Sequence, residues 1–368
     1  MIEKIADKIT AAQLKSPKMF LAVFIIITLL LVPGIFNLVD NIEPSLEKVL
    51  PQEIEEVKTM NDMREQFGAD MMYLLVYPDG PISDVRDPEF LIYMDLIKQK
   101  INSNEYILKV NTLADFVKDA NNNIIPASLM QTREILSKNP QTLRYSNAAY
   151  SLAIIEIKSD TGSSADLIKY VVDSIRTDID HLEEHNPGAR IEMTGFNAID
   201  KATFEVIMSD FASITIISML LVALVVFLTF GSLSKGMLPM IIVILSLVWT
   251  MGVVGYLGLT ITVVSMVAAA MIMGLGIDFG IHQVHTYYEK RKKHNSKESL
   301  VETVRELLRA MLGASLTTSA GFLALLFGVL PAMKILGIIL ALGIIFTLIG
   351  AIFLLPVVIY LYDGGKAI

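Results

Sequence analysis

The sequence predicts an α-helical membrane protein of six spans, with a folded α+β domain outside the cytoplasm between the first and second spans. Three observations indicate this fold class. Of the 368 residues, 53% are apolar and only 18% are charged, against about 45–50% and about 25% in soluble chains. The charge is segregated, because positions 40–210 carry 46 charged residues and positions 211–237 carry one, Lys235. Six apolar runs are also long enough to cross a bilayer.

A hydrocarbon core about 30 Å thick requires roughly 20 apolar helical residues. The six runs that meet this length are 19–38, 211–230, 237–257, 261–282, 311–330 and 335–361. The first run exceeds the apolar length of a signal peptide and no A-x-A site follows it, so we expect an uncleaved anchor. The chain then divides into an N-terminus (1–18), the first span (19–38), an extracytoplasmic domain (39–205), a bundle of spans 2 to 6 (206–362) and a tail (363–368).

The basic residues outside the large domain predict the orientation of the chain. Short connections rich in Lys and Arg stay in the cytoplasm, whereas long domains cross whatever their charge. Basic residues precede span 1, lie between spans 2 and 3, and cluster between spans 4 and 5: Lys4, Lys8, Lys15, Lys18, Lys235, Lys290, Arg291, Lys292, Lys293, Lys297, Arg305 and Arg309. We therefore expect both termini inside the cell membrane and the large domain outside it.

The connection between spans 4 and 5 has its own periodicity. Apolar residues recur at i, i+3 and i+4 spacing behind two candidate capping residues, Asn295 and Ser296: Leu300, Val304, Leu307, Leu308 and Met311. This pattern predicts an amphipathic helix over 296–310 on the inner membrane surface. A plain solvated loop is the alternative.

The segment between spans 1 and 2 has the periodicity of a folded α+β domain. Strands and helices are predicted at 71–77, 88–101, 106–111, 150–158, 164–184 and 189–194. The order βαββαβ is that of the split βαβ, or ferredoxin-like, arrangement, with 114–140 as a helical insertion. After Gly195, a helix that Asn197 could cap is expected to run directly into span 2. With 30 acidic and 16 basic residues between positions 40 and 210, the domain is not suited to nucleic acid or anionic headgroups.

One short motif carries little weight as a catalytic or metal site. His181-Leu-Glu-Glu184-His185 matches the inverted zinc-peptidase signature H-x-x-E-H, but it stands at the end of an acidic helix, where chance explains it better. The chain has no cysteine, which excludes thiol nucleophiles, disulfides and Cys-ligated metals. We expect neither an enzyme nor a cofactor, and a membrane zinc protease is only a remote alternative.

Asp278 is the most informative single residue. It is the only acidic residue within the six predicted spans, and it lies about 5 Å from the middle of the apolar run that extends from Ile261 to Tyr288. An ionised carboxylate there costs on the order of 2.5–3.5 kcal/mol on insertion scales, so such residues mark relays and ion sites. A carboxyl group that is neutral when dry and ionised when water or a partner reaches it could carry a proton.

Neighbouring residues could complete a proton relay around Asp278. His282 follows one helical turn later, and its imidazole can titrate near neutral pH. Span 5 supplies hydroxyl groups at a similar depth: Ser315, Thr317, Thr318 and Ser319. The alternative is that Asp278 only hydrogen-bonds to these hydroxyls and fixes helix packing. Around it, small residues allow close helix contact, and we expect this of Gly274, Gly276 and Gly280.

The chain resembles one half of an RND-superfamily transporter, a group that includes MmpL-type, hopanoid and Patched-like lipid transporters. The similarity rests on the layout of one span, a large domain and five spans, on G-L-G-I-D-F-G-I-H from Gly274 to His282, and on Thr317-Thr318. It implies that Asp278 is the proton-translocating group. Many relatives have Tyr where this chain has Phe279, so one hydroxyl of the relay is missing.

The resemblance implies a half-size, proton-driven transporter of lipid-like or other hydrophobic and amphiphilic substrates. Most relatives carry two such halves, so a homodimer is expected to replace them. The large domain resembles a porter domain without room for a docking extension, so no outer-membrane channel partner is expected, and nucleic acid is not expected to bind. A SecDF-like protein-export accessory and a non-pumping lipid-binding protein similar to sterol-sensing domains remain alternatives.

Overall fold

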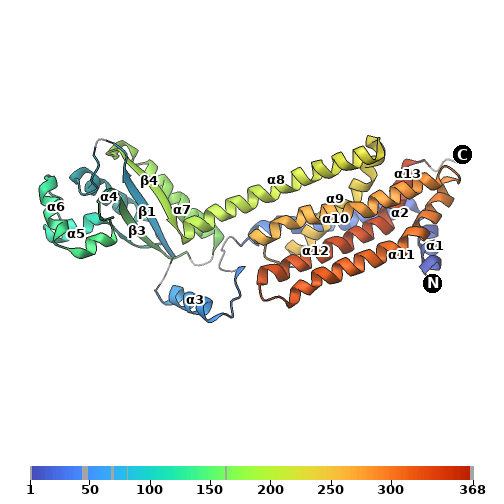
Figure 1. Cartoon of the computed structure of the whole chain (residues 1–368), viewed down its shortest axis with the longest axis horizontal. Coiled ribbons are helices and arrows are strands. Elements are labelled where there is room, and N and C mark those ends of the chain that lie inside the picture. Colours follow the sequence, from blue (N-terminus) through green and yellow to red (C-terminus); the bar gives the residue numbers. More distant parts are fainter. Residues whose placement is uncertain (1, 44–48, 68–69, 81, 162–163, 365–368) are drawn as a thin grey trace. The chain divides into compact units, whose positions relative to one another are not determined.

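The structure, a computed structural model, describes residues 2–43, 49–67, 70–80, 82–161 and 164–364. It divides into two compact units (Figure 1). The membrane unit comprises Met1–Pro51 and Val206–Ile368, and the α/β domain comprises Gln52–Glu205. Most of the predicted tail, 363–368, lies outside the described residues.

The membrane unit is built from helices that overlap the six predicted apolar runs. Within the described part of the chain, six helical segments are long and apolar enough to span a membrane. The helices of this unit are α1 (Ile2–Lys15), α2 (Pro17–Asp40), α8 (Phe196–Phe230), α9 (Leu233–Tyr256), α10 (Ala268–Lys290), α11 (Ser296–Leu323), α12 (Pro331–Ile349) and α13 (Leu355–Tyr362). A 3₁₀ turn at Val263–Val267 precedes α10, a second at Ala324–Phe327 follows α11, and a π-helical turn, Gly350–Leu354, joins α12 to α13.

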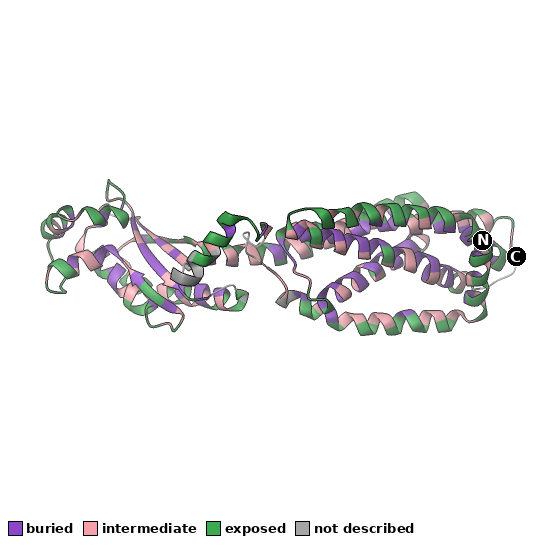
Figure 2. Ribbon diagram, turned by 90° about the horizontal axis from the view of Figure 1, so that it is seen from below, coloured by how far each residue is buried: buried purple, intermediate pink, exposed green. Residues whose placement is uncertain are grey.

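Helices α9 and α12 form the buried centre of the membrane unit. Figure 2 shows buried residues, in purple, on the inward sides of the helices of the bundle. Glycines let α2 approach α9 closely, because a Cβ atom added at Gly255 would meet the carbonyl oxygen of Gly34. On the same contact, the Trp249 ring stacks on Phe24 at 5.3 Å between centroids. The Trp249 indole also donates to Thr28 Oγ1 at 2.9 Å. Close backbone packing, with few polar bonds, is typical of helices in a bilayer.

The segment 296–310 is not a separate surface helix, contrary to the sequence prediction. It is the first half of the continuous helix α11. Its apolar stripe is buried in a cluster with residues of α9, α10 and α13, and includes Leu300, Val304, Leu308 and Met311. The i, i+3, i+4 pattern correctly predicts an amphipathic helix, but other helices of the protein, rather than lipid, cover the apolar face of this segment.

The α/β domain contains one four-stranded antiparallel sheet. Its strands are β1 (Asp70–Pro78), β2 (Ile107–Asn111), β3 (Ala153–Ser159) and β4 (Ala189–Gly195), arranged in the order β2-β3-β1-β4. Its helices are α3 (Glu55–Phe67), α4 (Pro88–Ile101), α5 (Leu113–Ala120), α6 (Leu129–Ser137) and α7 (Ala165–Asp180), with short 3₁₀ turns at Pro140–Arg144 and Glu183–His185. The elements of the sheet and its two crossover helices follow one another as β1, α4, β2, β3, α7 and β4.

The core of the domain lies between one face of the sheet and helices α4 and α7. Alternate residues of β1 and β3 are paired and fully buried there, such as Met72 with Ile157 and Leu74 with Ile155. The helices contribute Phe90, Leu91, Met94, Ile97, Ile168, Val171, Val172 and Ile175. This period of two in the strands, against helices with one apolar stripe, explains why the sequence predicts these elements well.

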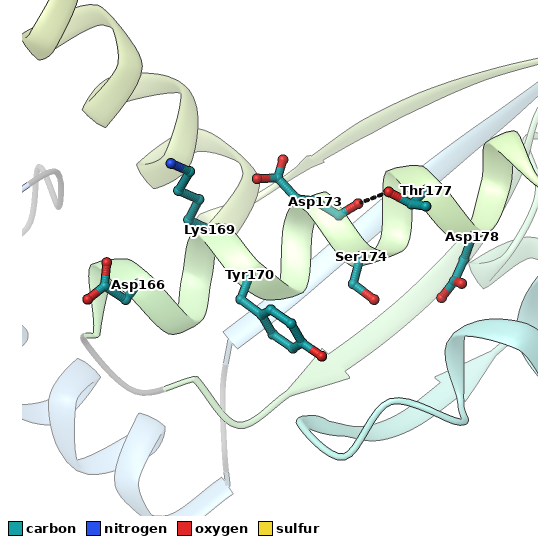
Figure 3. Close-up of a pocket in the computed structure, with 7 residues that line it drawn as sticks. All are labelled: Asp166, Lys169, Tyr170, Asp173, Ser174, Thr177 and Asp178. Atoms are coloured by element: carbon teal, nitrogen blue, oxygen red, sulfur yellow. Dashed lines mark hydrogen bonds between the residues drawn. The ribbon is translucent and has the colours of Figure 1, made fainter.

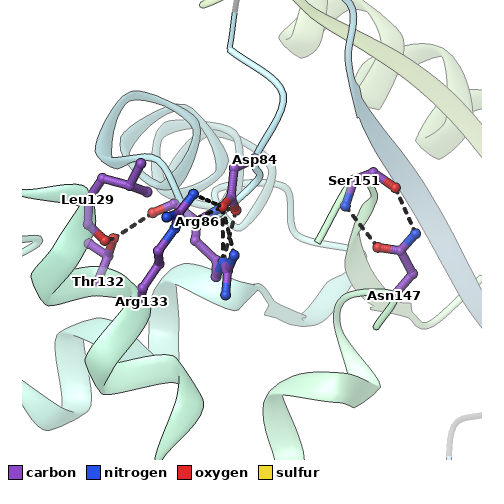
Figure 4. Close-up of polar contacts among 7 residues, drawn as sticks. All are labelled: Asp84, Arg86, Leu129, Thr132, Arg133, Asn147 and Ser151. Atoms are coloured by element: carbon purple, nitrogen blue, oxygen red, sulfur yellow. Dashed lines mark hydrogen bonds and ion pairs between the residues drawn. The ribbon is translucent and has the colours of Figure 1, made fainter. Parts of the chain in front are cut away.

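The insertion between β2 and β3 is fixed to the start of α4 by a polar cluster (Figure 4). Asp84 accepts from Arg86 at 2.7 Å and from Arg133 of α6 at 2.8 Å. The Thr132 hydroxyl donates to the Arg86 carbonyl at 2.7 Å. Burial opposes ionisation of Asp84, but these hydrogen bonds hold its pKa below the ordinary range. The insertion is therefore attached by a charged pair as well as by apolar contacts.

Helix α8 begins in the α/β domain and continues into the membrane unit. The predicted continuous helix is therefore present. Asn197 does not cap it, because the helix already includes Phe196. Its amide instead donates to Ser159 Oγ at 3.0 Å and Thr161 Oγ1 at 2.8 Å. One turn later, Lys201 is 5% exposed and its ammonium lies 2.6 Å from Asp173 of α7.

Candidate functional site

Helix α10 carries the residues that the sequence predicts as a site, and its glycines determine which side faces the bundle. A Cβ atom added at Gly276 would lie 2.9 Å from Thr347 of α12. One added at Gly280 would lie 2.8 Å from the Cα atom of Pro239 in α9. The two glycines therefore pack α10 against two different helices. Gly274 differs from the prediction, since nothing lies within 4 Å of a Cβ atom there.

Asp278 lies on the opposite side of α10, which the membrane unit leaves exposed. The exposed residues repeat at helical spacing along this side: Gly274, Leu275, Asp278, His282, His285 and Glu289. Among the described residues, none forms a hydrogen bond or ion pair with Asp278. The carboxylate therefore stands at the centre of an open stripe, which we call the α10 stripe.

The hydroxyl groups of α11 point in different directions. Ser315 and Ser319 are buried, at 1% and 5% exposure, and neither hydroxyl has a hydrogen-bond partner within the described chain. Thr317 is exposed, and its hydroxyl donates to carbonyls of its own helix, at 2.9 Å to Gly313 and 3.0 Å to Ala314. Thr318 is partly buried. No described hydrogen bond joins any of them to Asp278.

Two polar residues near the site escaped sequence reasoning. His285 is exposed on the α10 stripe one turn after His282, and its i+3 spacing could have indicated it. Gln283 is 2% exposed, and its Oε1 atom has no partner among the described residues. Nothing in the local sequence distinguishes Gln283 from a residue that faces solvent, because only the packing of α10 places it inside.

The carboxyl-terminal end of α10 is tied to the end of α13. Asp363 accepts from Arg291 Nε and from the Tyr287 hydroxyl, both at 2.8 Å, and that hydroxyl lies 2.9 Å from Ser296 Oγ. Burial would raise the pKa of Asp363, but the hydrogen bonds from Arg291 and Tyr287 lower it below its ordinary range. An ion pair and a hydrogen bond therefore join the ends of the fourth and sixth spans, through Tyr287 and Arg291, which follow Asp278 in the sequence.

The α/β domain offers a groove of about 490 Å³ along α7 (Figure 3). Residues of this one helix line it: Asp166, Lys169, Tyr170, Asp173, Ser174, Thr177 and Asp178. Asp173 already pairs with Lys201, and burial raises the pKa of Asp178 although Lys100 and His181 oppose the shift. The groove is open and Asp173 is paired with Lys201, so it indicates no reaction.

The histidine motif at 181–185 does not form the helical face that a zinc peptidase needs. Helix α7 ends at Asp180, His181 is its C-cap residue, and Glu183–His185 form a 3₁₀ turn. In the part of the chain that the structure describes, no three His, Asp or Glu side chains are grouped so that they could hold a metal ion.

Comparison with known proteins identifies the family. The sequence matches the MMPL family over residues 97–366, a segment that includes α10 and the α10 stripe. The chain belongs to the MMPL family. Together with the six apolar helices, this membership supports a multi-pass membrane protein of the RND type. The family's members are transporters rather than enzymes.

Three relatives show how much of an MMPL protein this chain contains. It is 28% identical to a membrane protein named MJ1562 of Methanocaldococcus jannaschii, over 99% of this chain and 95% of the relative. It is 27% identical to the membrane protein ActII-3 of Streptomyces coelicolor, over 46% of this chain and 24% of that protein. It is 24% identical to the siderophore exporter MmpL5 of Mycobacterium tuberculosis, over 56% of this chain and 22% of that protein.

Proposed function

We propose that this chain is a proton-driven transporter of lipid-like or other amphiphilic molecules, in which Asp278 carries the proton. One observation carries the proposal. Asp278, the single acidic residue within the six predicted apolar runs, is exposed on the membrane unit and has no partner among the described residues. A carboxylate in hydrocarbon costs on the order of 2.5–3.5 kcal/mol, whereas a neutral carboxyl costs much less, so Asp278 should bind a proton whenever water leaves it.

A second copy of the chain is the proposed cover for the α10 stripe. Leu275 on the stripe and Leu316 on α11 are 40% and 65% exposed, and glycines with open space, Gly274 and Gly313, would let another helix approach. A homodimer through this side would bring two Asp278 carboxyls close together. Like charges disfavour simultaneous ionisation of the two carboxyls.

The α/β domain is proposed as a ferredoxin-like porter domain that handles the cargo. The strand order β2-β3-β1-β4 and the two crossover helices on one face support this reading. The continuous helix α8 is the proposed link by which a change at Asp278 alters the domain. An amphiphilic cargo follows from the family and from the apolar surroundings of the site, and a siderophore exporter among the relatives is compatible with it.

The test is the Asp278→Asn variant of the full chain in liposomes. With a pH gradient imposed, we expect proton uptake and movement of a fluorescent phospholipid to fall to the level of empty liposomes. The Asp278→Glu variant, which keeps a titrating group, should retain part of both activities.

Glu289→Gln is the matched control, because Glu289 is an exposed carboxylate of the same stripe near the end of α10. It should leave both rates unchanged. If the folded Asp278→Asn protein moves protons and lipid at the original rates, Asp278 is not the carrier. If protons move but no lipid does, the cargo class is wrong while the coupling site stands.

A further inference from the structure

Helix α1 has two faces of different character. Ala6, Thr10 and Gln13 are almost fully buried, at 0–1% exposure, against the rest of the membrane unit. Lys4, Lys8 and Lys15 are exposed on the other side, within about 40° of one another at 100° per residue. Only Ser16 separates α1 from α2, the first spanning helix, where Lys18 is also exposed. We call the four lysines the lysine face.

The lysine face has no counter-charge within the described chain. The one ion pair described for α1 joins Asp7 to Arg305 of α11 at 2.8 Å, on a different side of the helix. Ile5 is 46% exposed beside the lysines. Unpaired lysines beside an exposed apolar side chain, at the end of a spanning helix, match the boundary between hydrocarbon and lipid headgroups. In Figure 1, α1 lies at the end of the bundle where both termini are found.

The buried face of α1 supplies a hydrogen bond that the last span lacks. Pro356 has no backbone N–H, so the Ile352 carbonyl four residues earlier cannot make its usual helical bond. The chain forms a π-helical turn at this point, Gly350–Leu354. Gln13 Nε2 donates to the Ile352 carbonyl at 2.8 Å and to the Phe353 carbonyl at 3.2 Å. Helix α1 thus holds an irregular turn of the spanning bundle.

We propose that the lysine face binds anionic phospholipid headgroups of the adjacent leaflet, and that this binding holds α1 and Gln13 against the π-helical turn. The positive charges have the sign and the place that phosphate headgroups require. A bound lipid would stabilise α1 in its docked position, because the lysines and Gln13 lie on opposite sides of one short, rigid helix. The α1 site does not involve Asp278, and it stands whether or not the chain pumps protons.

The test titrates the purified full chain in neutral detergent with phosphatidylglycerol, with phosphatidylcholine as the uncharged comparison. Native mass spectrometry gives the affinity, and the fluorescence of Trp249, the one tryptophan, gives the melting temperature. Each lysine should contribute about fivefold to the affinity. The variant Lys4→Gln/Lys8→Gln/Lys15→Gln should therefore bind phosphatidylglycerol on the order of 100-fold more weakly and lose the lipid-dependent rise in melting temperature.

A matched control removes the same charge from the same end of the unit. Lys292, Lys293 and Lys297 are exposed in and beside the connection between α10 and α11, and their triple Gln variant should keep the affinity. Equal losses in both triple variants would overturn the α1 site, because they would reflect general attraction to this end of the protein. Equal binding of phosphatidylcholine, or displacement of the lipid by soluble glycerol phosphate, would also overturn the assignment.

Gln13→Ala tests the connection to the last span separately. The lipid should still bind this variant, with an affinity lowered only by the lost coupling to docking, but phosphatidylglycerol should no longer slow amide hydrogen exchange in α13. If the lipid protects α13 equally in the variant, the link through Gln13 is wrong. Should the triple lysine variant fail to fold, Lys8→Gln alone provides the fivefold test, and a variant with Arg at the three positions should restore binding.

Discussion

The α/β domain and the membrane unit differ in how many of their polar groups have a hydrogen-bond or ion-pair partner. In the domain, Lys201 is 5% exposed and is paired with Asp173, and Asn197 is 1% exposed and bonds two hydroxyls. In the membrane unit, Ser315 and Ser319 are buried without a partner among the described residues, and Asp278 faces outward without one. The domain has one described exception, the Tyr93 hydroxyl, whose burial raises its pKa to about 12.

The buried polar groups of the domain therefore find most of their hydrogen-bond partners within it. The spanning helices leave several polar groups without a partner among the described residues. Unpaired buried groups are costly and are kept mainly where function uses them. Water, protons or a second subunit are the partners that a transporter can supply to them. Packing in the membrane unit depends instead on close contacts at glycine.

The largest effect on stability is expected where α2 packs against α9 in the membrane unit. Gly255→Leu should separate α2 from α9, because even a Cβ atom there would meet the Gly34 carbonyl. Backbone contacts cannot yield as side chains do, so we expect a loss of more than about 3 kcal/mol and a protein that aggregates on extraction. Fluorescence size-exclusion chromatography and the melting temperature measure this.

Gly274→Leu is the matched control, since a Cβ atom there meets nothing within 4 Å in the membrane unit. The folded subunit should keep its melting temperature in dilute detergent. If Gly274 lies in the proposed dimer contact, the variant should shift the protein from dimer to monomer in native mass spectrometry. Equal destabilisation by both substitutions would show that glycine contacts do not explain the packing.

A smaller effect is expected when the domain loses a charged pair. Asp84→Asn removes the partner of Arg86 and Arg133, and hydrogen bonds to charged groups contribute about 1.5–3 kcal/mol. Because the pKa of Asp84 is lower in the folded domain than in the unfolded chain, its stabilisation is full at neutral pH. It should disappear as the pH falls from about 4 through the lowered pKa.

Hydrogen exchange at the amides of α6 measures this attachment across the pH range. In Asp84→Asn, α6 should exchange faster at pH 7, and the pH dependence below about 4 should weaken. Glu134→Gln removes the exposed pair with Lys138 on the same helix and should leave the exchange of α6 unchanged. Unaltered exchange in both variants would mean that apolar contacts alone hold the insertion.

The sequence predicts the α/β domain to within a few residues where local signals act alone. Helix α4 occupies the expected 88–101, because Asp87 caps it and Pro88 opens it. The predicted strand at 150–158 begins late, at Ala153. Tyr150 adopts a φ of 54° in a turn where Asn147 and Ser151 exchange two hydrogen bonds (Figure 4). No periodicity reveals such a turn.

In the membrane unit, hydropathy predicts that a segment spans but not which side of it faces a neighbour. All six predicted spans overlap helical segments that are long and apolar enough to cross a membrane, yet Gly274 and Ser315 lie on sides that the sequence did not indicate. Both sides of a spanning helix are apolar, so the packing around α9 and α12 decides orientation. The role of Gln13 was missed as well, because it depends on the turn before Pro356, 343 positions later.

The smallest change in stability is expected for the hydroxyls of α11, which include buried groups without a partner among the described residues. Ser315→Ala removes a buried, unpaired hydroxyl, so stability should stay the same or rise by up to about 1 kcal/mol. Thr317→Val should change it little, because that hydroxyl only returns to carbonyls of its own helix. If Ser315 belongs to the proton relay, proton uptake in liposomes should fall several-fold in Ser315→Ala although the protein is no less stable. Unchanged proton uptake in both variants would show that Asp278 carries protons without the hydroxyls of Ser315 and Thr317. A destabilised Ser315→Ala protein would show instead that the Ser315 hydroxyl has a structural partner.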